Sequence, residues 1–157
     1  MSVEARGTAM RILDFEPDHL RRFTPQALQA GIVPFIRDNL SVVGPAYAQG
    51  RAFSGEIDGR IVGSAGVRVH APGIGVAWAL LSDGALRHPR PLVRACARGL
   101  TAIERALGLF RIEATVALGH GAGDRFITAL GFEPEGLLEN YGLWGVGDYI
   151  LYARERT

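Results

Sequence analysis

Arginine side chains recur at helical spacing in the middle of the sequence. Four of them lie three or four residues apart: Arg87, Arg90, Arg94 and Arg98. A helix would place them on one face, and a guanidinium group binds a phosphate through paired hydrogen bonds. The alternative is that they form the solvated face of an amphipathic helix. We expect Arg87 and Arg90 to contact a ligand, and Arg94 and Arg98 to face solvent.

His120 is a second residue whose type can do chemistry. It lies in the segment Gly119-His-Gly-Ala-Gly123. Imidazole titrates near neutral pH, so a histidine can accept a proton from an amine directly or through water. The alternative is structural, because polar loop residues often cap turns through their side chains. Tyr141 carries a hydroxyl further along the chain that can exchange a proton.

The hydrophobic pattern predicts the central elements that position these residues. Residues 53–57 and 60–69 flank an Asp58-Gly59 pair, which predicts a β-hairpin because Asp-Gly suits the turn between twisted strands. The apolar segment 76–81 predicts a strand covered on both faces. Pro89 and Pro91 then introduce a long helix that stops at Gly108. Cys96 lies on the apolar stripe of that helix, so we expect it in the core.

Shorter elements complete the prediction. They are a strand over 8–15, short helices after Pro17 and after Pro25 (the second ending at Gly31), a helix over 34–49 interrupted by Pro45, a strand over 111–118, a helix over 124–130, and strands around 137–141 and 149–153. Hairpins come first, and strands alternate with helices later. We therefore expect residues 1–157 to form one α/β (α+β) domain, with a mixed, mostly antiparallel sheet of six to seven strands and helices on both faces.

The order of these segments resembles that of the GNAT superfamily of N-acyltransferases. Residues 111–116, the Gly-rich turn, the short helix and Ala129-Leu-Gly-Phe132 resemble the family's fifth strand, fourth helix and Gly-Phe corner. The hairpin over 55–63 resembles strands two and three. Residues 132–141 resemble the sixth strand, and residues 148–154 resemble the last one. The resemblance covers residues 51–154 and is closest to small GNAT-like proteins encoded by phages.

The resemblance implies acetyl-CoA as co-substrate. In the family, the backbone of the fourth strand holds the pantetheine arm, and amides at the start of the next helix bind the pyrophosphate. The matching residues here are Leu80, Leu81, Ser82, Arg87, His88 and Arg90. No metal site is expected.

The pyrophosphate loop departs from the family pattern. The family has Arg or Gln, two residues, Gly, one residue, then Gly or Ala, whereas this chain has Arg87-His-Pro-Arg-Pro-Leu92. Arg90 and Leu92 occupy the small positions. Pro89 and Pro91 remove two amide donors from the helix start. We expect arginine side chains to substitute for the lost amides.

The family's catalytic groups are replaced as well. The tyrosine that protonates the leaving thiolate in many members corresponds to Ile127 here, and the fourth strand carries no Glu to act as base. The resemblance places His120, Glu113 and Tyr141 near the reacting atoms. We expect His120 to accept the proton of the incoming amine, with Tyr141 as the competing proton-transfer group.

Composition and charge exclude other classes of function. The net charge is +1, whereas nucleic-acid binding needs a basic excess. No segment approaches the ~20 apolar residues of a membrane span, and the N-terminus resembles no secretory signal. The single cysteine suits a reducing compartment. We therefore expect a soluble protein of the cytoplasm, or of the host cytoplasm or virion if it is phage-encoded, that binds neither nucleic acid nor membrane.

Two functions remain open. The first is N-acetyl transfer from acetyl-CoA to a small-molecule or protein amine, in which positioning supplies most of the catalysis. The second is a non-catalytic GNAT-fold phage protein that acts through contacts with a virion or host protein. The lost glycines and tyrosine favour the second, while the element order suits both. We favour the enzyme. The expected macromolecular partner is a second copy of the chain or a virion protein.

Overall fold

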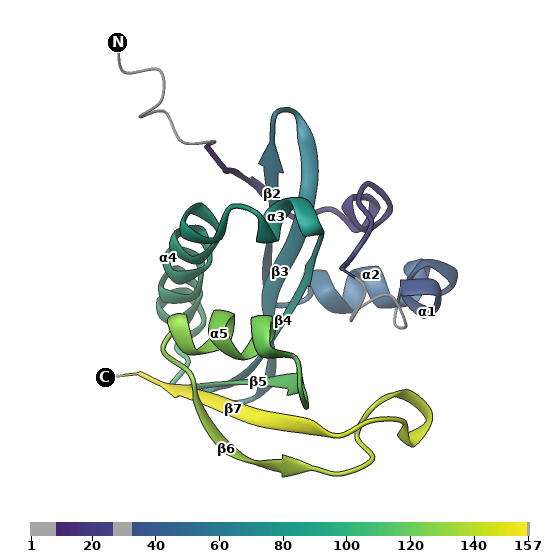
Figure 1. Cartoon of the computed structure of the whole chain (residues 1–157). Helices are drawn as coiled ribbons and strands as arrows, with labels where there is room; N and C mark the ends of the chain where they lie inside the picture. The colour runs from purple at the N-terminus through teal and green to yellow at the C-terminus, as the bar shows by residue number, and fades with distance from the viewer. Residues whose placement is uncertain (1–8, 27–32, 157) are drawn as a thin grey trace.

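The computed structural model describes residues 9–26 and 33–156 of the chain (Figure 1). Within these ranges seven strands form one sheet in the order β1-β2-β3-β4-β5-β7-β6. They are β1 (Arg11–Asp14), β2 (Arg51–Ile57), β3 (Arg60–Ala71), β4 (Ile74–Leu81), β5 (Arg111–Ala117), β6 (Glu133–Leu138) and β7 (Tyr149–Glu155). Neighbouring strands run antiparallel except β4 and β5, so the predicted mixed, mostly antiparallel sheet is confirmed.

Helices cover both faces of this sheet, as Figure 1 shows. The helical elements are η1 (Pro17–Arg21), α1 (Val33–Asp38), α2 (Leu40–Ala48), α3 (Asp83–Leu86), α4 (Pro89–Leu107), α5 (Gly121–Ala129) and η3 (Leu143–Gly145). One apolar cluster joins α4 and α5 to the sheet around Val67 and Ile112. A second cluster joins η1, α1 and α2 to the sheet around Leu20 and Leu80. The sheet therefore lies between two apolar layers.

The predicted turn and stop signals are confirmed. Asp58 and Gly59 have φ values of 51° and 77°, which is the left-handed backbone of a primed turn between β2 and β3. Gly108 ends α4 with a φ of 62°, and its N–H donates to the carbonyl of Glu104. Glycine adopts this conformation more readily than residues with a side chain, so the sequence position of the helix end follows from local chemistry.

The long helix α4 buries the stripe that the sequence predicted. Its buried apolar residues are Leu92, Cys96, Leu100 and Ile103. Burial raises the pKa of the Cys96 thiol to about 12, so the thiol is neutral at physiological pH and serves packing. No helix in the described ranges is long and apolar enough to span a membrane.

The short helix expected after Pro17 forms as the five-residue 3-10 helix η1. Two other expectations near the N-terminus were wrong. Pro45 does not interrupt a helix but lies inside α2, where an exposed position tolerates the loss of one backbone hydrogen bond. Pro25 starts no helix; it pairs with Ser82 in an isolated antiparallel bridge. The rest of that expected helix, up to Gly31, lies outside the described residues.

The C-terminal elements are shifted relative to the prediction. β6 covers Glu133–Leu138 rather than 137–141, so Tyr141 lies in the turn beyond the strand. α5 begins at Gly121 rather than Asp124, because His120 caps it. The single-turn helix α3 after β4 was not predicted. It forms because the hydroxyl of Ser82 accepts the N–H of Ala85 at its start.

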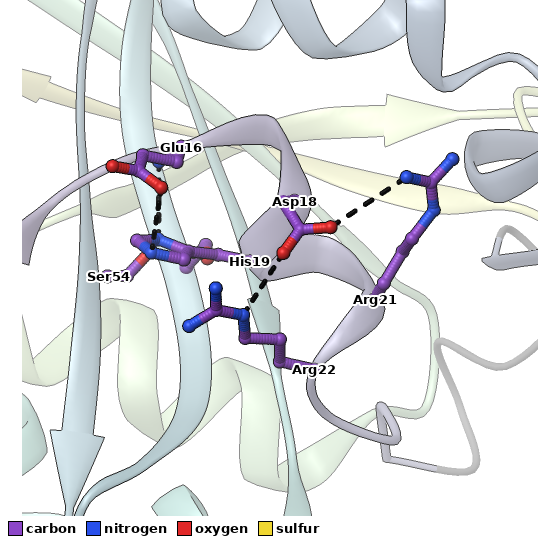
Figure 2. A network of polar contacts seen from close by, with 7 residues as sticks. Glu16, Asp18, His19, Arg21, Arg22 and Ser54 are labelled. Carbon is purple, nitrogen blue, oxygen red and sulfur yellow. Dashed lines mark hydrogen bonds and ion pairs between the residues drawn. The ribbon is translucent and has the colours of Figure 1, made fainter.

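His19 anchors η1 to the sheet through a buried polar network (Figure 2). His19 Nδ1 lies 2.7 Å from Ser54 Oγ on β2, and Ser54 Oγ lies 2.8 Å from Ser64 Oγ on β3. The Glu16 backbone N–H also donates to His19 Nδ1. Ser54 has no exposed surface, so these hydroxyls satisfy one another in the core rather than meeting a substrate. After η1 the chain reaches the end of β4, where Pro25 pairs with Ser82.

Candidate functional site

The two parallel strands at the centre of the sheet separate along their length. β4 and β5 pair only through residues 74–76 and 111–113. Beyond this point β4 stays with β3 as far as Leu81, whereas β5 stays with β7 as far as Ala117. Figure 1 shows the two strands running apart. The sheet is therefore open between them, in a wedge whose closed end is the short paired segment.

A cavity of about 590 Å³ occupies this wedge. The volume lies within the ~300–1000 Å³ range of small-molecule sites. Its walls are mostly apolar and include Ala77, Trp78, Ala79, Leu80, Ala114, Val116, Phe126 and Ile127. Tyr47 from α2 and Cys96 from α4 also line it, so the cavity passes through the sheet from one helical layer to the other.

The end of β4 supplies two of the predicted donor-binding residues to the cavity wall. Leu80 and Leu81 both line it, and the Leu81 carbonyl accepts the N–H of Gln26 at 2.9 Å. Ser82 is not among the lining residues. Its hydroxyl donates to the Val62 carbonyl at 2.6 Å and caps α3, so Ser82 shapes the turn after the strand.

The loop between β4 and α4 has few free amides. His88 is the N-cap of α4, and the Leu92 N–H donates to its carbonyl. The N–H of Arg87 donates to Asp83, and Pro89 and Pro91 have none. The backbone N–H of Arg90 is therefore what this helix start offers to an anion. Leu92 is buried in the core, which explains why a large residue stands at a position where the family has a small one.

The exposed charge of α4 is positive along most of its length. The exposed arginines of the loop and helix are Arg87, Arg90, Arg94, Arg98 and Arg105, and the first turn of α4 carries no acidic residue. The first four of these side chains form no ion pair with any described residue, whereas Arg111, Arg154 and Arg11 all do. Cations near a helix N-terminus oppose the helix dipole, and a bound anion removes that conflict. This end of α4 is therefore suited to an anionic ligand.

His120 caps α5 and borders the cavity. Its Nδ1 accepts the backbone N–H of Gly123, so Nε2 carries the proton of the neutral ring. Nε2 lies 3.2 Å from Oε1 of Gln26, to which it donates. His120 is buried and lines the cavity beside Gln26. The ring is thus used structurally, and its role as proton acceptor stays a prediction.

The structure does not bring the other predicted proton-transfer residues to the cavity wall. Tyr141 is 56% exposed, and its ring packs edge-on against Tyr149 at 5.6 Å between centroids. Glu113 lies 3.4 Å from Arg111 in a surface ion-pair cluster with Glu135. Neither Tyr141 nor Glu113 lines the cavity. Tyr149, whose ring contacts that of Tyr141, does line the cavity.

Four polar residues that sequence analysis missed line the cavity: Gln26, Tyr47, Thr115 and Tyr149. The Tyr47 ring packs on Trp78 at 4.3 Å between centroids. Burial raises the pKa of the Tyr47 hydroxyl, and the nearby Arg68 guanidinium partly opposes this shift. Thr115 and Tyr149 lie on predicted strands and could have been found by their register. Gln26 and Tyr47 carried no such signal. No group of side chains that could hold a metal ion occurs in the described ranges.

Fold and wedge together define the class of structure. A seven-stranded mixed sheet whose central parallel strands separate, with a helix N-terminus after the fourth strand, is the GNAT fold. Comparison of the sequence with protein-family models and with curated proteins gives no match.

Solved structures share this fold across nearly the whole chain. A GNAT-family acetyltransferase from Bacillus anthracis superposes with a TM-score of 0.71 at 15% identity, covering 96% of each chain. The ribosomal-protein-S5-alanine acetyltransferase from Vibrio fischeri superposes with a TM-score of 0.68 at 16% identity, covering 96% of this chain and 94% of that one. RimJ from Mycobacterium smegmatis, in complex with CoA-disulfide, superposes with a TM-score of 0.66 at 22% identity, covering 93% and 81%. The predicted GNAT fold is confirmed, while the resemblance to phage-encoded members stays a prediction.

Proposed function

We propose that this protein is an N-acyltransferase that moves an acyl group, in the simplest case acetyl, from coenzyme A to an amine. The observation that carries the proposal is the cavity of about 590 Å³ held between the separated strands β4 and β5. Structures of the same fold are acetyltransferases, and one of them holds a CoA-disulfide. The amine is a small molecule or a protein group.

Donor binding is assigned to the end of β4 and the start of α4. The thioester arm would enter the cavity beside Leu80 and Leu81, where it would replace or adjoin the contact of Gln26 with the Leu81 carbonyl. The phosphates would meet the Arg87 and Arg90 side chains and the Arg90 N–H, with His88 between them. Paired guanidinium contacts then compensate for the two amides that proline removes.

Transfer requires the amine nitrogen to attack the thioester carbonyl carbon. The C–S bond breaks, coenzyme A leaves as a thiolate, and the amine gives up a proton. Because the thioester is already activated, positioning in the cavity supplies most of the rate. We assign proton acceptance to His120, which must exchange its Gly123 contact for the amine or a water molecule to do so. Tyr141 is the competing proton-transfer group.

One observation favours a second candidate function. The turn between β6 and β7 exposes a group of apolar side chains that also border the cavity, with Trp144 at 93% exposure beside Leu143 and Val146. Exposed apolar groups of this kind often mark contacts with another protein. A non-catalytic GNAT-fold protein, of the phage type to which the sequence has some resemblance, would use this turn to bind a virion or host protein. In that case the protein would be found in the same compartment as its virion or host partner.

A turnover assay separates the two functions. The protein is incubated with acetyl-CoA and a panel of amines that includes aminoglycosides, polyamines and peptides with free N-termini, and the released CoA thiol is followed over time. Amine-dependent thiol release supports the enzyme. Absence of release with every amine, together with capture of Trp144-dependent complexes, would favour the binding protein.

A further inference from the structure

The cavity extends beyond the region that the arginines can reach. The α4 residues that line it are Cys96, Leu100 and Ile103, from the middle and last third of the helix. A helix rises ~1.5 Å per residue, so Ile103 lies ~20 Å along the axis from Arg90. The cavity therefore reaches under α4, toward the closed end of the wedge.

This deeper part has a purely apolar wall. We call it the inner chamber and define it by five residues of one buried apolar cluster and the half-buried Ala77 packed against them. The five are Leu100, Ile103, Ala114, Leu130 and Phe132. None of the six side chains can form a hydrogen bond. Among the polar lining residues, Gln26 and Tyr47 belong to other elements, and Thr115 follows Ala114 on β5, where successive side chains point to opposite faces of the sheet.

Small side chains on the sheet keep the inner chamber open. β4 and β5 place alanine at positions 77 and 114, where larger apolar residues would fill the space below α4 and α5. Protein interiors are normally packed without such voids, and an unfilled apolar cavity lowers stability in proportion to its volume. Water does not occupy a cavity whose walls offer no polar partners. An apolar ligand that fills the chamber removes the loss of stability caused by the empty space.

We infer that the inner chamber binds the acyl chain of a medium-chain acyl-CoA, so that the preferred donor is longer than acetyl-CoA. The inference rests on the proposed function and names its donor. The whole cavity has room for ~20 atoms at the ~30 Å³ that a liquid water molecule occupies. The thioester arm would take the part beside Leu80 and Leu81, and the acyl chain would take the inner chamber. A polar amine acceptor does not fit the inner chamber, because its donors would lose water without gaining a partner.

The chemical step is the same as for acetyl. The amine nitrogen bonds to the acyl carbonyl carbon, the C–S bond breaks, and the thiolate of coenzyme A leaves with the electron pair. The amine proton passes to the acceptor in the cavity or to the thiolate. The chain in the inner chamber takes no part in bond making; it holds the carbonyl in place.

A titration series tests the inference on the full chain. Acetyl-, butyryl-, hexanoyl- and octanoyl-CoA are titrated by calorimetry. Each added methylene should tighten binding by about threefold to fourfold until the inner chamber is full. Ala77→Leu fills the chamber, so it should weaken octanoyl-CoA at least tenfold and change acetyl-CoA less than threefold. Ala102→Leu, the same substitution on the exposed face of α4, is the matched control and should change neither.

The outcomes separate this inference from the proposed function. Acetyl-CoA bound as tightly as octanoyl-CoA would overturn the inference and leave acyl transfer standing. An equal loss of octanoyl-CoA binding in Ala77→Leu and Ala102→Leu would also overturn it. No binding of any CoA ester would overturn both. If Ala77→Leu does not fold, Ala114→Val places a smaller side chain in the same chamber. Weaker octanoyl-CoA binding in this variant would support the inference, and unchanged octanoyl-CoA binding would overturn it.

Discussion

Gln26 and His120 hydrogen-bond across the open wedge of the sheet, with 3.2 Å between Gln26 Oε1 and His120 Nε2. Gln26 also donates its backbone N–H to the carbonyl of Leu81 on β4. His120 in turn caps α5, which follows β5. One buried glutamine thus links the two separated strands at the mouth of the cavity, although its own chain segment belongs to neither.

This link predicts a stability cost for Gln26→Ala. The substitution leaves the Nε2–H of His120 buried without its partner, so we expect the free energy of unfolding to fall by about 1–3 kcal/mol. Urea denaturation measures it. Gln49→Ala, at an exposed position after α2, is the matched control and should change stability by less than about 0.5 kcal/mol. Equal effects of the two substitutions would show that the link carries no stability.

His120→Asn separates capping from proton transfer. Asparagine can accept the Gly123 N–H and so keep the cap, but it cannot act as a base near neutral pH. If His120 accepts the amine proton, turnover should fall by about 100-fold while the melting temperature changes little. His120→Ala should lose the cap as well, at about 1 kcal/mol. If His120→Asn keeps wild-type turnover and Tyr141→Phe loses it, the proton-transfer role belongs to Tyr141 and not to His120.

The start of α4 predicts unequal roles for its arginines. Arg90→Ala should weaken acyl-CoA binding by about 1.5–3 kcal/mol, which is the scale of a hydrogen bond to a charged group. Arg98→Ala removes the same charge two turns further along and should change the affinity by less than about 0.5 kcal/mol at physiological salt, because solvent and ions screen it. Calorimetry at matched salt compares them. Similar losses of affinity in Arg90→Ala and Arg98→Ala would mean that the positive charge of the whole helix attracts the phosphates, with no specific contact from Arg90.

Cys96 predicts a change of stability at high pH. Burial raises its pKa from 9.0 to about 12, so the folded state keeps the thiol proton that the unfolded state loses. The contribution is complete below pH 9 and is lost as the pH rises toward 12, at about 1.4 kcal/mol per pH unit. Other groups titrate in this range, so Cys96→Ala is the control. The wild type should lose stability faster than the variant between pH 9 and pH 11, and equal slopes would contradict the shift.

Local chemistry explains which parts of the fold could be predicted. The Asp58-Gly59 turn and the Gly108 helix end depend on backbone conformations that few residues adopt, and both were predicted correctly. The apolar stripe through Cys96 and Leu100 depends only on helical periodicity. Pro45 was placed wrongly, because the packing of α2 on the sheet outweighs one lost hydrogen bond. β6 was shifted because residues 133–136 carry little apolar pattern.

The candidate site was harder to predict, because long-range contacts assemble it. The positions of Leu80 and Leu81 could be predicted from the apolar strand that ends with them, and the position of His120 from the glycine-rich turn that contains it. Gln26 and Tyr47 reach the cavity only because the buried contact of His19 with Ser54 anchors η1 and because α2 packs on the sheet. No spacing in the sequence encodes those contacts.

The central claim is that a coenzyme A thioester binds between β4 and β5, and calorimetric titration of the wild-type chain with acetyl-CoA tests it most directly. We predict saturable binding with one site per chain and a Kd in the micromolar range, roughly −7 to −8 kcal/mol. Acetyl-CoA should also raise the melting temperature in a concentration-dependent way. No heat and no thermal shift with millimolar acetyl-CoA, or with any longer acyl-CoA ester of the same titration series, would contradict the claim.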